Sequence, residues 1–175
     1  MIKANFVTAR KAAAMVKDGD TVCTVGMTLV SASESILKAL EKDFIETGHP
    51  CGMTLLHSCG QSDRKDGIQH FAHEGMIKRI IGSHWGLQPR WMEMIAGNQV
   101  EAYCLPQGQI AQLYHSMACG LPGKMSKVGL GTFIDPRYEG GKMNDRTKPL
   151  EDIIDIMEYR GEEYMFYREI PIDVC

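Results

Sequence analysis

The residues best suited to hold a small ligand stand in one short segment, Pro106-Gln107-Gly108, between an apolar run and an amphipathic one. Proline has no N–H to continue a strand ladder, and glycine allows backbone angles that a Cβ forbids. The amide of Gln107 can donate and accept hydrogen bonds at once. Backbone N–H groups at the start of the following helix would suit an anionic ligand. The segment fits a ligand clamp, and it fits an ordinary strand-to-helix turn equally well.

Three further small or hydroxyl residues, Gly129, Gly131 and Thr132, lie where another backbone could pass close by. A hairpin in this stretch is the alternative. The Gly129-Leu130-Gly131 pair alone is a weak signal, because the chain has no phosphate loop and no Gly-x-Gly-x-x-Gly after its first predicted strand. It also lacks the Gly-x-Ser-x-Gly elbow of hydrolases.

Histidines offer the other candidates for chemistry. His70 and His73 are three residues apart and would share one helix face, as metal ligands do. They lack the His-Glu-x-x-His arrangement and a third ligand at a familiar spacing, so we expect no metal here. Instead, we expect the ring N–H groups of the two histidines to cap nearby carbonyls. His84, beside Trp85 at the end of a predicted strand, is the better site candidate; the alternative is a histidine hydrogen-bonded beneath a loop.

The composition is that of one ordinary globular domain. Of 175 residues 44% are apolar and 23% charged, and the formal net charge is -3. Scattered Lys and Arg give no support for nucleic-acid binding. The apolar runs are too short to span a bilayer, and the N-terminus lacks the apolar core of a signal peptide. Six cysteines without a Cys-x-x-Cys pair indicate a reduced, cytoplasmic protein. Because the apolar runs are short, we expect no membrane partner.

A repeated alternation of strand and helix patterns must position these residues. Strands are predicted at 20–25, 53–57, 79–81 and 100–105, and helices at 8–17, 31–47, 70–77, 89–97 and 109–118. Consecutive strand-then-helix units predict an α/β fold with a mostly parallel sheet flanked by helices on both faces. Beyond residue 123 the chain becomes irregular. Residues 151–157 could form a helix or a strand, a hairpin turns at Arg160-Gly161, and 170–174 is again extended.

In a parallel sheet every strand exit lies on one edge, where ligands bind at the carboxyl ends of the strands. The exits carry glycines and small polar or apolar residues, namely Gly26, Met27, Gly60, Gln61, His84, Pro106, Gln107 and Gly108. No exit carries a carboxylate that could act as a nucleophile. The residues therefore predict a ligand edge without a reactive group.

Several long strings carry a family resemblance. They are residues 18–22, 70–78 (HFAHEGMIK), 101–108, 129–137 (GLGTFIDPR), 140–142 and 164–174. On these strings the chain resembles the family I coenzyme A transferases, most of all the propionate and acetate CoA-transferases that carry both halves on one chain. The resemblance runs in one register from about Phe6 to the last residue.

The resemblance implies a ping-pong transfer of coenzyme A between a short-chain acyl-CoA and a carboxylic acid. A glutamate attacks the thioester, and no metal or redox cofactor takes part, because coenzyme A is itself a substrate. The first half of such chains supplies a wall of the site, here Gly26 and Gln107-Gly108. Gln107 would bind the catalytic carboxylate or the acyl oxygen, and backbone N–H groups would stabilise the oxyanion. Val25-Gly26-Met27 replaces the double glycine before an aromatic residue of many members, a difference that bears on acyl-group size.

The resemblance also implies that residues 1–175 are a truncated N-terminal (alpha-type) domain, incomplete at its C-terminus. The second domain, which would bring the catalytic glutamate, is absent, so no catalytic residue lies in this chain and we expect it to be inactive alone. Its partner would be that second half or another copy of itself. Two alternatives remain: a non-catalytic module that binds acyl-CoA or a small acid, and an interaction-only remnant whose open sheet edge pairs with a second copy.

Overall fold

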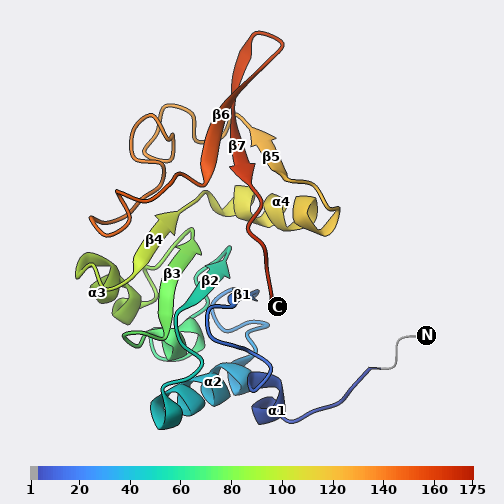
Figure 1. The fold of residues 1–175 in the computed structure, drawn as a ribbon, viewed down its shortest axis with the longest axis vertical. Helices are drawn as coiled ribbons and strands as arrows, with labels where there is room; N and C mark the ends of the chain where they lie inside the picture. The colour runs from blue at the N-terminus through green and yellow to red at the C-terminus, as the bar shows by residue number, and fades with distance from the viewer. Residues whose placement is uncertain (1–3) are drawn as a thin grey trace.

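A four-stranded parallel sheet forms the centre of the computed structural model, which describes residues 4–175 (Figure 1). Strands β1 (Thr21–Thr24), β2 (Met53–His57), β3 (Ile77–Gly82) and β4 (Glu101–Cys104) lie side by side in chain order. Because right-handed crossovers all proceed in one direction, they place the connecting elements on a single face. The predicted α/β fold with a parallel sheet is confirmed.

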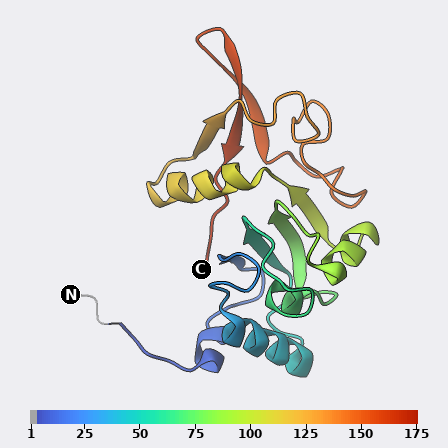
Figure 2. The same ribbon diagram turned by 180° about the vertical axis from the view of Figure 1, so that it is seen from behind.

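Helices cover both faces of this sheet. On one face lie α1 (Ala9–Ala13), α2 (Glu34–Thr47), the short 3₁₀ helix η1 (Gly67–Phe71) and α3 (Pro89–Ala96). On the other lies α4 (Gln107–Ala118), between the parallel sheet and an antiparallel sheet (Figures 1 and 2). That second sheet has the order β5-β7-β6, with β5 at Gly123–Ser126, β6 at Ile154–Tyr159 and β7 at Glu162–Arg168. Within residues 4–175, no helix has the length and apolar content needed to cross a membrane.

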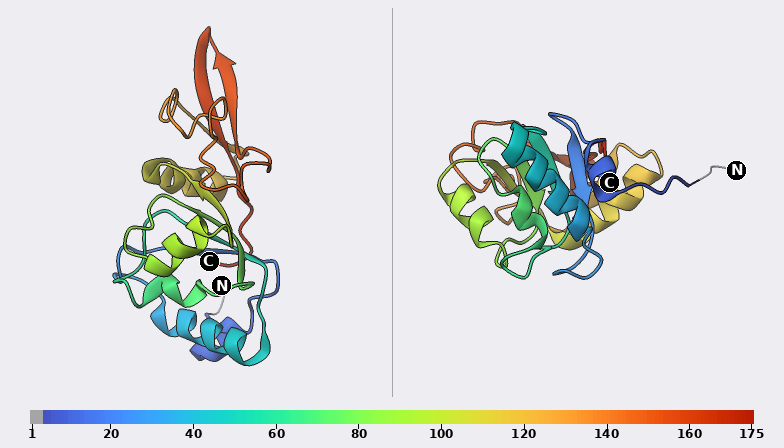
Figure 3. Two further views of the ribbon diagram at one scale, coloured as in Figure 1. Left: turned by 90° about the vertical axis from the view of Figure 1, so that its left-hand side faces the viewer. Right: turned by 90° about the horizontal axis from the view of Figure 1, so that it is seen from below.

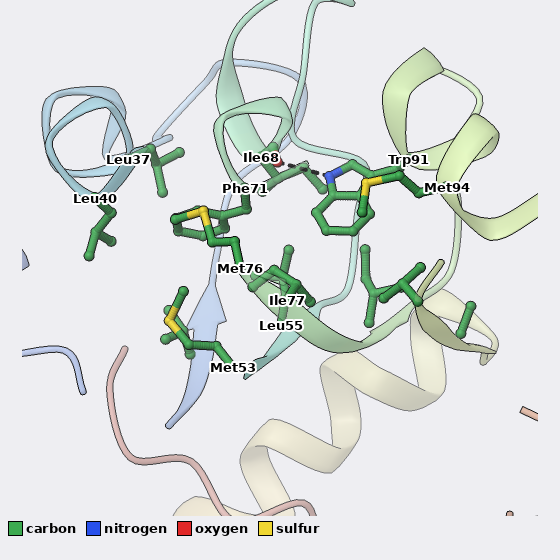
Figure 4. Packing of buried hydrophobic residues seen from close by; sticks show 14 of the residues in the cluster. Leu37, Leu40, Met53, Leu55, Ile68, Phe71, Met76, Ile77, Trp91 and Met94 are labelled. Atoms are coloured by element: carbon green, nitrogen blue, oxygen red, sulfur yellow. Dashed lines mark hydrogen bonds between the residues drawn. The ribbon is translucent and has the colours of Figure 1, made fainter. Parts of the chain in front are cut away.

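Successive strand residues enter two different cores, because side chains alternate across a strand. Leu55 packs under the helical face, in the cluster drawn in Figure 4, where Trp91 donates to the carbonyl of Ile68 across 2.8 Å. Its neighbour Leu56 packs with Leu113 of α4 on the opposite face. Burial of each such apolar side chain contributes about 1.5–3 kcal/mol, so both layers hold the sheet in place.

The stop signal of one helix and the start signal of another act as predicted. Gly48 closes α2 in the left-handed conformation with φ 78°, although α2 begins at Glu34, later than the predicted residue 31, and the side chain of Ser33 before it makes no capping hydrogen bond. Pro89 stands in the first turn of α3, where its missing N–H costs nothing. The predicted strand at 53–57 coincides with β2.

The predicted helix over 70–77 is wrong. The structure has a single 3₁₀ helix, Gly67–Phe71, and Ile77 already belongs to β3. Ala72 leaves the helical region with ψ 63°. The polar residues of this segment are spaced to bind carboxylates of α2, described below, and not to form one face of a helix.

The observed ends of two further helices also differ from the predicted ones. Helix α1 ends at Ala13, short of the predicted residue 17, where the N–H of Lys17 donates to the Asp20 carboxylate across 2.8 Å. Helix α4 begins at Gln107, two residues earlier than predicted. Strand β5 was not predicted.

The C-terminal part resolves the ambiguity at 151–157 in favour of a strand. Strands β6 and β7 form a hairpin that projects from the body (Figure 3). Its turn lies at Arg160-Gly161, as predicted, with φ values of 55° and 78°.

The chain returns to the β1 side of the sheet at its C-terminus (Figure 1). Val174 pairs in parallel with Val22, and its carbonyl accepts the N–H of Cys23 across 2.8 Å. At the opposite margin Lys142 pairs antiparallel with Tyr103 of β4. The chain therefore adds β2, β3 and β4 on one side of β1 and the parallel segment at Val174 on the other side. Open α/β sheets place their ligand crevice at such a change of direction.

Candidate functional site: the carboxyl edge of the sheet

The four strand exits lie along one edge, as predicted, and hydrogen-bond to one another. These bonds are Gln61 Nε2 to the Thr24 carbonyl (2.7 Å), Thr28 N–H to the Gly60 carbonyl (3.3 Å), Ser83 Oγ to the Ser58 carbonyl (2.5 Å) and Leu105 N–H to the Gly82 carbonyl (2.8 Å). Every neighbouring pair of exits is linked. The edge is therefore one continuous rim, on which a ligand would meet several loops at once.

The β1 exit is a tight loop that needs a glycine at its base. Gly26 has φ 142°, and a Cβ there would lie 2.8 Å from the carbonyl oxygen of Val30. Thr28 and Ser31 also have positive φ, 54° and 63°, which is rare for residues with a Cβ. Met27 is left 61% exposed at the loop surface. Such concentrations of backbone strain are typical of functional loops.

The β2 exit is buried. Gly60 lies under the side chain of Gln88, whose amide group would stand 2.6 Å from a Cβ. Gln61 is 0% exposed, and its amide nitrogen binds the Thr24 carbonyl, while its amide oxygen has no hydrogen-bond partner among the described residues. Gln61 therefore joins two exits beneath the surface.

At the β3 exit the structure reveals a residue that sequence reasoning missed. His84 is exposed, but His57, at the end of β2, is fully buried beneath it. His57 Nδ1 lies 2.9 Å from the Cys59 carbonyl, and Trp85 Nε1–H donates to His57 Nε2 across 3.2 Å. Burial lowers the pKa of His57 to about 4. The hydrogen bond to the Cys59 carbonyl opposes this shift, and the nearby His84 lowers the pKa by a smaller amount. The uncharged imidazole ring therefore lies under the exits of β2 and β3 and hydrogen-bonds to both. A single histidine in an apolar run gives no sequence signal for that role.

At the β4 exit Pro106, Gln107 and Gly108 form the start of α4. The Pro106 carbonyl accepts the N–H groups of Gln109 and Ile110, at 2.9 and 3.1 Å. Gln107 and Gly108 are exposed in the first helical turn. The N–H groups of Gln107 and Gly108, the first two residues of the helix, have no acceptor within the helix, so this end suits an oxyanion.

Gly129, Gly131 and Thr132 lie beside the antiparallel sheet. Thr132 Oγ1 donates to the Gly129 carbonyl across 2.7 Å, and the Gly131 N–H donates to Asp135 across 2.9 Å. A Cβ at Gly129 would stand 2.8 Å from the hydroxyl of Tyr167 in β7. The same loop reaches the β4 exit further on, where Gly141 accepts the N–H of Cys104 across 2.7 Å.

The two neighbouring histidines bind carboxylates and not the carbonyls that the sequence suggested. Glu41 of α2 contacts both rings, His70 Nδ1 at 2.5 Å and His73 Nε2 at 2.7 Å. The other nitrogen of His70 lies 2.7 Å from Glu34. Burial alone would raise the pKa of the Glu34 and Glu41 carboxyls. Hydrogen bonds, including those from the histidines, outweigh burial, so the pKa of each carboxyl lies below its usual value. This cluster fastens η1 to α2 on the helical face.

Residues 6–174 match the sequence model of the family described as "Coenzyme A transferase". The chain belongs to this family. It is 39% identical over 173 residues to a caffeate CoA-transferase of Acetobacterium woodii, and the match covers 98% of this chain and 33% of that protein. The acetate CoA-transferase YdiF of Escherichia coli K12 is 35% identical over 97% of this chain and 32% of its own length. The resemblance inferred from the sequence is confirmed.

Solved structures agree with the fold. The acyl-CoA transferase YdiF apoenzyme of Escherichia coli O157:H7 superposes with a TM-score of 0.89 at 34% identity, covering 95% of this chain and 32% of that one. Glutaconate coenzyme A-transferase of Acidaminococcus fermentans has a TM-score of 0.72 at 18% identity, over 95% of this chain and 54% of that one, and shows the shared fold alone. The chain spans about a third of the length of these two curated relatives, namely 33% and 32%.

Proposed function

We propose that this chain forms one wall of an active site that moves coenzyme A between a short-chain acyl-CoA and a carboxylic acid. The observation that carries the proposal is the common rim on which all four strand exits meet. Membership of the CoA transferase family supports the reaction class. Relatives named for acetate and caffeate support a carboxylic acid as the second substrate.

The reaction would run through one glutamate in two half-reactions. Its carboxylate oxygen attacks the thioester carbonyl carbon, the CoA thiolate leaves, and an acyl-glutamyl anhydride forms. The thiolate then attacks the glutamyl carbonyl and expels the first acid, which leaves a glutamyl-CoA thioester. A second carboxylic acid reverses these steps. Coenzyme A enters as a substrate, and no metal or redox cofactor is required.

The rim supplies binding and polarisation. The exposed amide of Gln107 would hold the glutamate carboxylate or the acyl oxygen, and the N–H groups at the start of α4 would stabilise the oxyanion beside the Gly26 loop. Met27 would contact the acyl group, and His84 would add a polar contact beside it. Gly131 and Thr132, both exposed, would extend the wall toward coenzyme A.

The attacking glutamate would come from a second domain outside this sequence, in the same polypeptide or in a partner chain, so that residues 1–175 are inactive alone. Two grooves beside β1 support a further packing partner. One, of about 670 Å³, lies against α1 and α2, and the other, of about 470 Å³, lies against α4. Both include Cys175 in their lining, so one additional layer of polypeptide would cover both.

Calorimetric titration of the chain with acetyl-CoA tests this assignment. We expect binding in the millimolar range or tighter, no transfer of coenzyme A to propionate by the chain alone, and transfer once the glutamate-bearing domain is added. Absence of binding at millimolar acetyl-CoA would identify an interaction-only remnant. Binding that never leads to transfer in the reconstituted protein would identify a non-catalytic module.

A further inference from the structure

Three metal-ligating side chains meet at the opposite, amino edge of the sheet. Asp18 precedes β1, and His49 and Cys51 precede β2, so both segments enter the sheet at this edge. Oδ2 of Asp18 lies 2.7 Å from Nδ1 of His49, and the same nitrogen lies 3.9 Å from Sγ of Cys51. One carboxylate oxygen, one imidazole nitrogen and one sulfur thus fall within 4.8 Å of one another.

The backbone holds these donors in register. The N–H of Cys51 donates to the second oxygen of Asp18 across 2.8 Å, and the N–H of Gly19 donates to the Cys51 carbonyl across 2.9 Å. The Asp18 carboxylate is therefore oriented by a hydrogen bond on one oxygen, while its other oxygen faces His49. A hydrogen bond of this kind, here from a backbone N–H, holds a metal-binding carboxylate in one orientation.

The arrangement does not suit nucleophilic catalysis. In a Cys-His-Asp relay the two ring nitrogens face different partners, whereas here Nδ1 of His49 faces both the carboxylate and the sulfur. The cluster thus has the donors of a metal site and lacks the geometry of a catalytic one.

We propose that Asp18, His49 and Cys51 bind one Zn²⁺ or similar d-block cation. Thiolate, imidazole and carboxylate are the ligands of Zn²⁺, at about 2.0–2.3 Å in tetrahedral sites. The cation displaces the thiol proton and the proton between Nδ1 and Oδ2, and it separates those two atoms. Three protein ligands leave the fourth position to water.

The surroundings admit such an ion. The side chains of His49 and Asp18 are 65% and 49% exposed, so the cation enters directly from solvent. An adjoining groove of about 550 Å³ is lined by both residues and also by Lys17, Arg10 and Asp43, the last two of which form an ion pair at 4.0 Å. A bound ion would cross-link the segments that enter β1 and β2, and would stabilise the amino edge of the sheet.

The cluster at η1 is the less suitable cation site. Glu34, Asp66 and His70 also bring ligand atoms together. There, however, the ammonium of Lys38 already lies 3.1 Å from Glu34 and 3.2 Å from Asp66. A cation would have to displace Lys38, whereas no lysine or arginine forms an ion pair with Asp18 in the part of the chain that the structure describes.

Titration of the chelator-treated full chain with Zn²⁺ under reducing conditions, by calorimetry, tests the proposal, with Co²⁺ as a spectroscopic probe. We expect one ion per chain and a near-ultraviolet thiolate-to-Co²⁺ absorption band. Cys51→Ser abolishes the band and, like His49→Gln, weakens Zn²⁺ binding at least tenfold. Both positions are only partly buried or exposed, so the variants fold, which circular dichroism verifies.

Cys119→Ser is the matched control, because Cys119 is exposed and lies 4.0 Å from His115 on α4, without a carboxylate in the group. It keeps full Zn²⁺ affinity. The proposal is overturned if the wild-type chain binds no Zn²⁺, if Cys51→Ser binds it unchanged, or if Cys119→Ser removes the binding. X-ray absorption of the Zn²⁺-loaded wild-type chain gives an independent result, since a coordination shell without sulfur contradicts the site.

Discussion

The indole N–H of Trp85 donates to Nε2 of His57 across 3.2 Å, beneath the rim and not on its surface. The opposite nitrogen of the ring then carries the proton and donates to the Cys59 carbonyl, 2.9 Å away. This pair of contacts fixes one neutral tautomer and links the exits of β2 and β3. The candidate site therefore rests on a histidine that touches no solvent.

The buried His57 makes stability depend on pH. Its pKa is about 4 in the fold and ordinarily 6.5, so the unfolded chain binds more protons between those values. The contribution of His57 to the free energy of unfolding is therefore complete above about pH 6.5. The free energy of unfolding falls by roughly 3 kcal/mol for this group as the pH drops toward 4. Urea unfolding at a series of pH values measures it. His57→Gln should flatten this part of the profile and the exposed His115→Gln should not; a wild-type profile already flat there would refute the assignment.

Gly26 should be less replaceable than another glycine of positive φ. Gly26→Ala places a Cβ 2.8 Å from the Val30 carbonyl, whereas Gly19, at φ 79°, has nothing within 4 Å. We expect Gly26→Ala to cost about 1–3 kcal/mol more than Gly19→Ala and to weaken acetyl-CoA binding, since it distorts the loop that presents Met27. Urea unfolding and calorimetry compare the two variants. Equal effects of both would show that the close approach to Val30 is unimportant.

Asp135 should be the charged residue whose loss most disturbs the loop of Gly131. Its side chain is 0% exposed and accepts hydrogen bonds from the Gly131 N–H and from the Arg137 guanidinium. Asp135→Asn should cost about 1.5–3 kcal/mol, the value of hydrogen bonds to a charged group. Asp145→Asn, which breaks an exposed pair with Lys148, is the control and should leave the urea midpoint unchanged.

The same carboxylate should resist acid. Hydrogen bonds from Arg137 hold the pKa of Asp135 well below its usual 3.8, although burial opposes them. Its contribution to stability is present above pH 3.8 and is lost only as the pH falls further. The unfolding free energy of Asp135→Asn and wild type should therefore converge only in strong acid. Convergence already at pH 5 would contradict this.

Gln107 should affect the reaction and not the fold. It is exposed in the first turn of α4, and so is Gln112 further along the helix. In an assembled enzyme Gln107→Ala should lower kcat by about 10²-fold, the usual effect of removing one donor to a developing oxyanion. Gln112→Ala should leave kcat unchanged, and both should unfold like wild type. A Gln107→Ala enzyme with full kcat would remove this residue from the site.

The order of elements could be predicted from the sequence because local signals agreed with the fold. Apolar strand patterns, Gly48 after α2 and Pro89 at the start of α3 mark the units, and parallel strands necessarily share one exit edge. Strand β5 could not be predicted, since Gly123–Ser126 has no strand pattern and owes its extended form to pairing with β7.

The details of the site depended on contacts distant in sequence. Nothing local shows that Gln61 is buried against Thr24, or that His57 stands under Trp85. The histidine spacing at 70–77 predicts a helix wrongly, since the carboxylates that bind His70 lie roughly thirty residues earlier, on α2, and leave no local signal. Asp18 and Cys51 likewise meet only through the pairing of β1 with β2.

A chimeric enzyme tests the central claim most directly. This chain would replace the matching first third of the caffeate CoA-transferase of Acetobacterium woodii, to which it is 39% identical. Transfer of coenzyme A from acetyl-CoA to a carboxylic acid is then measured for the chimera and for the chain alone. We predict transfer by the chimera and none by the chain. A folded chimera without activity, or a pure chain that transfers coenzyme A by itself, would contradict the account.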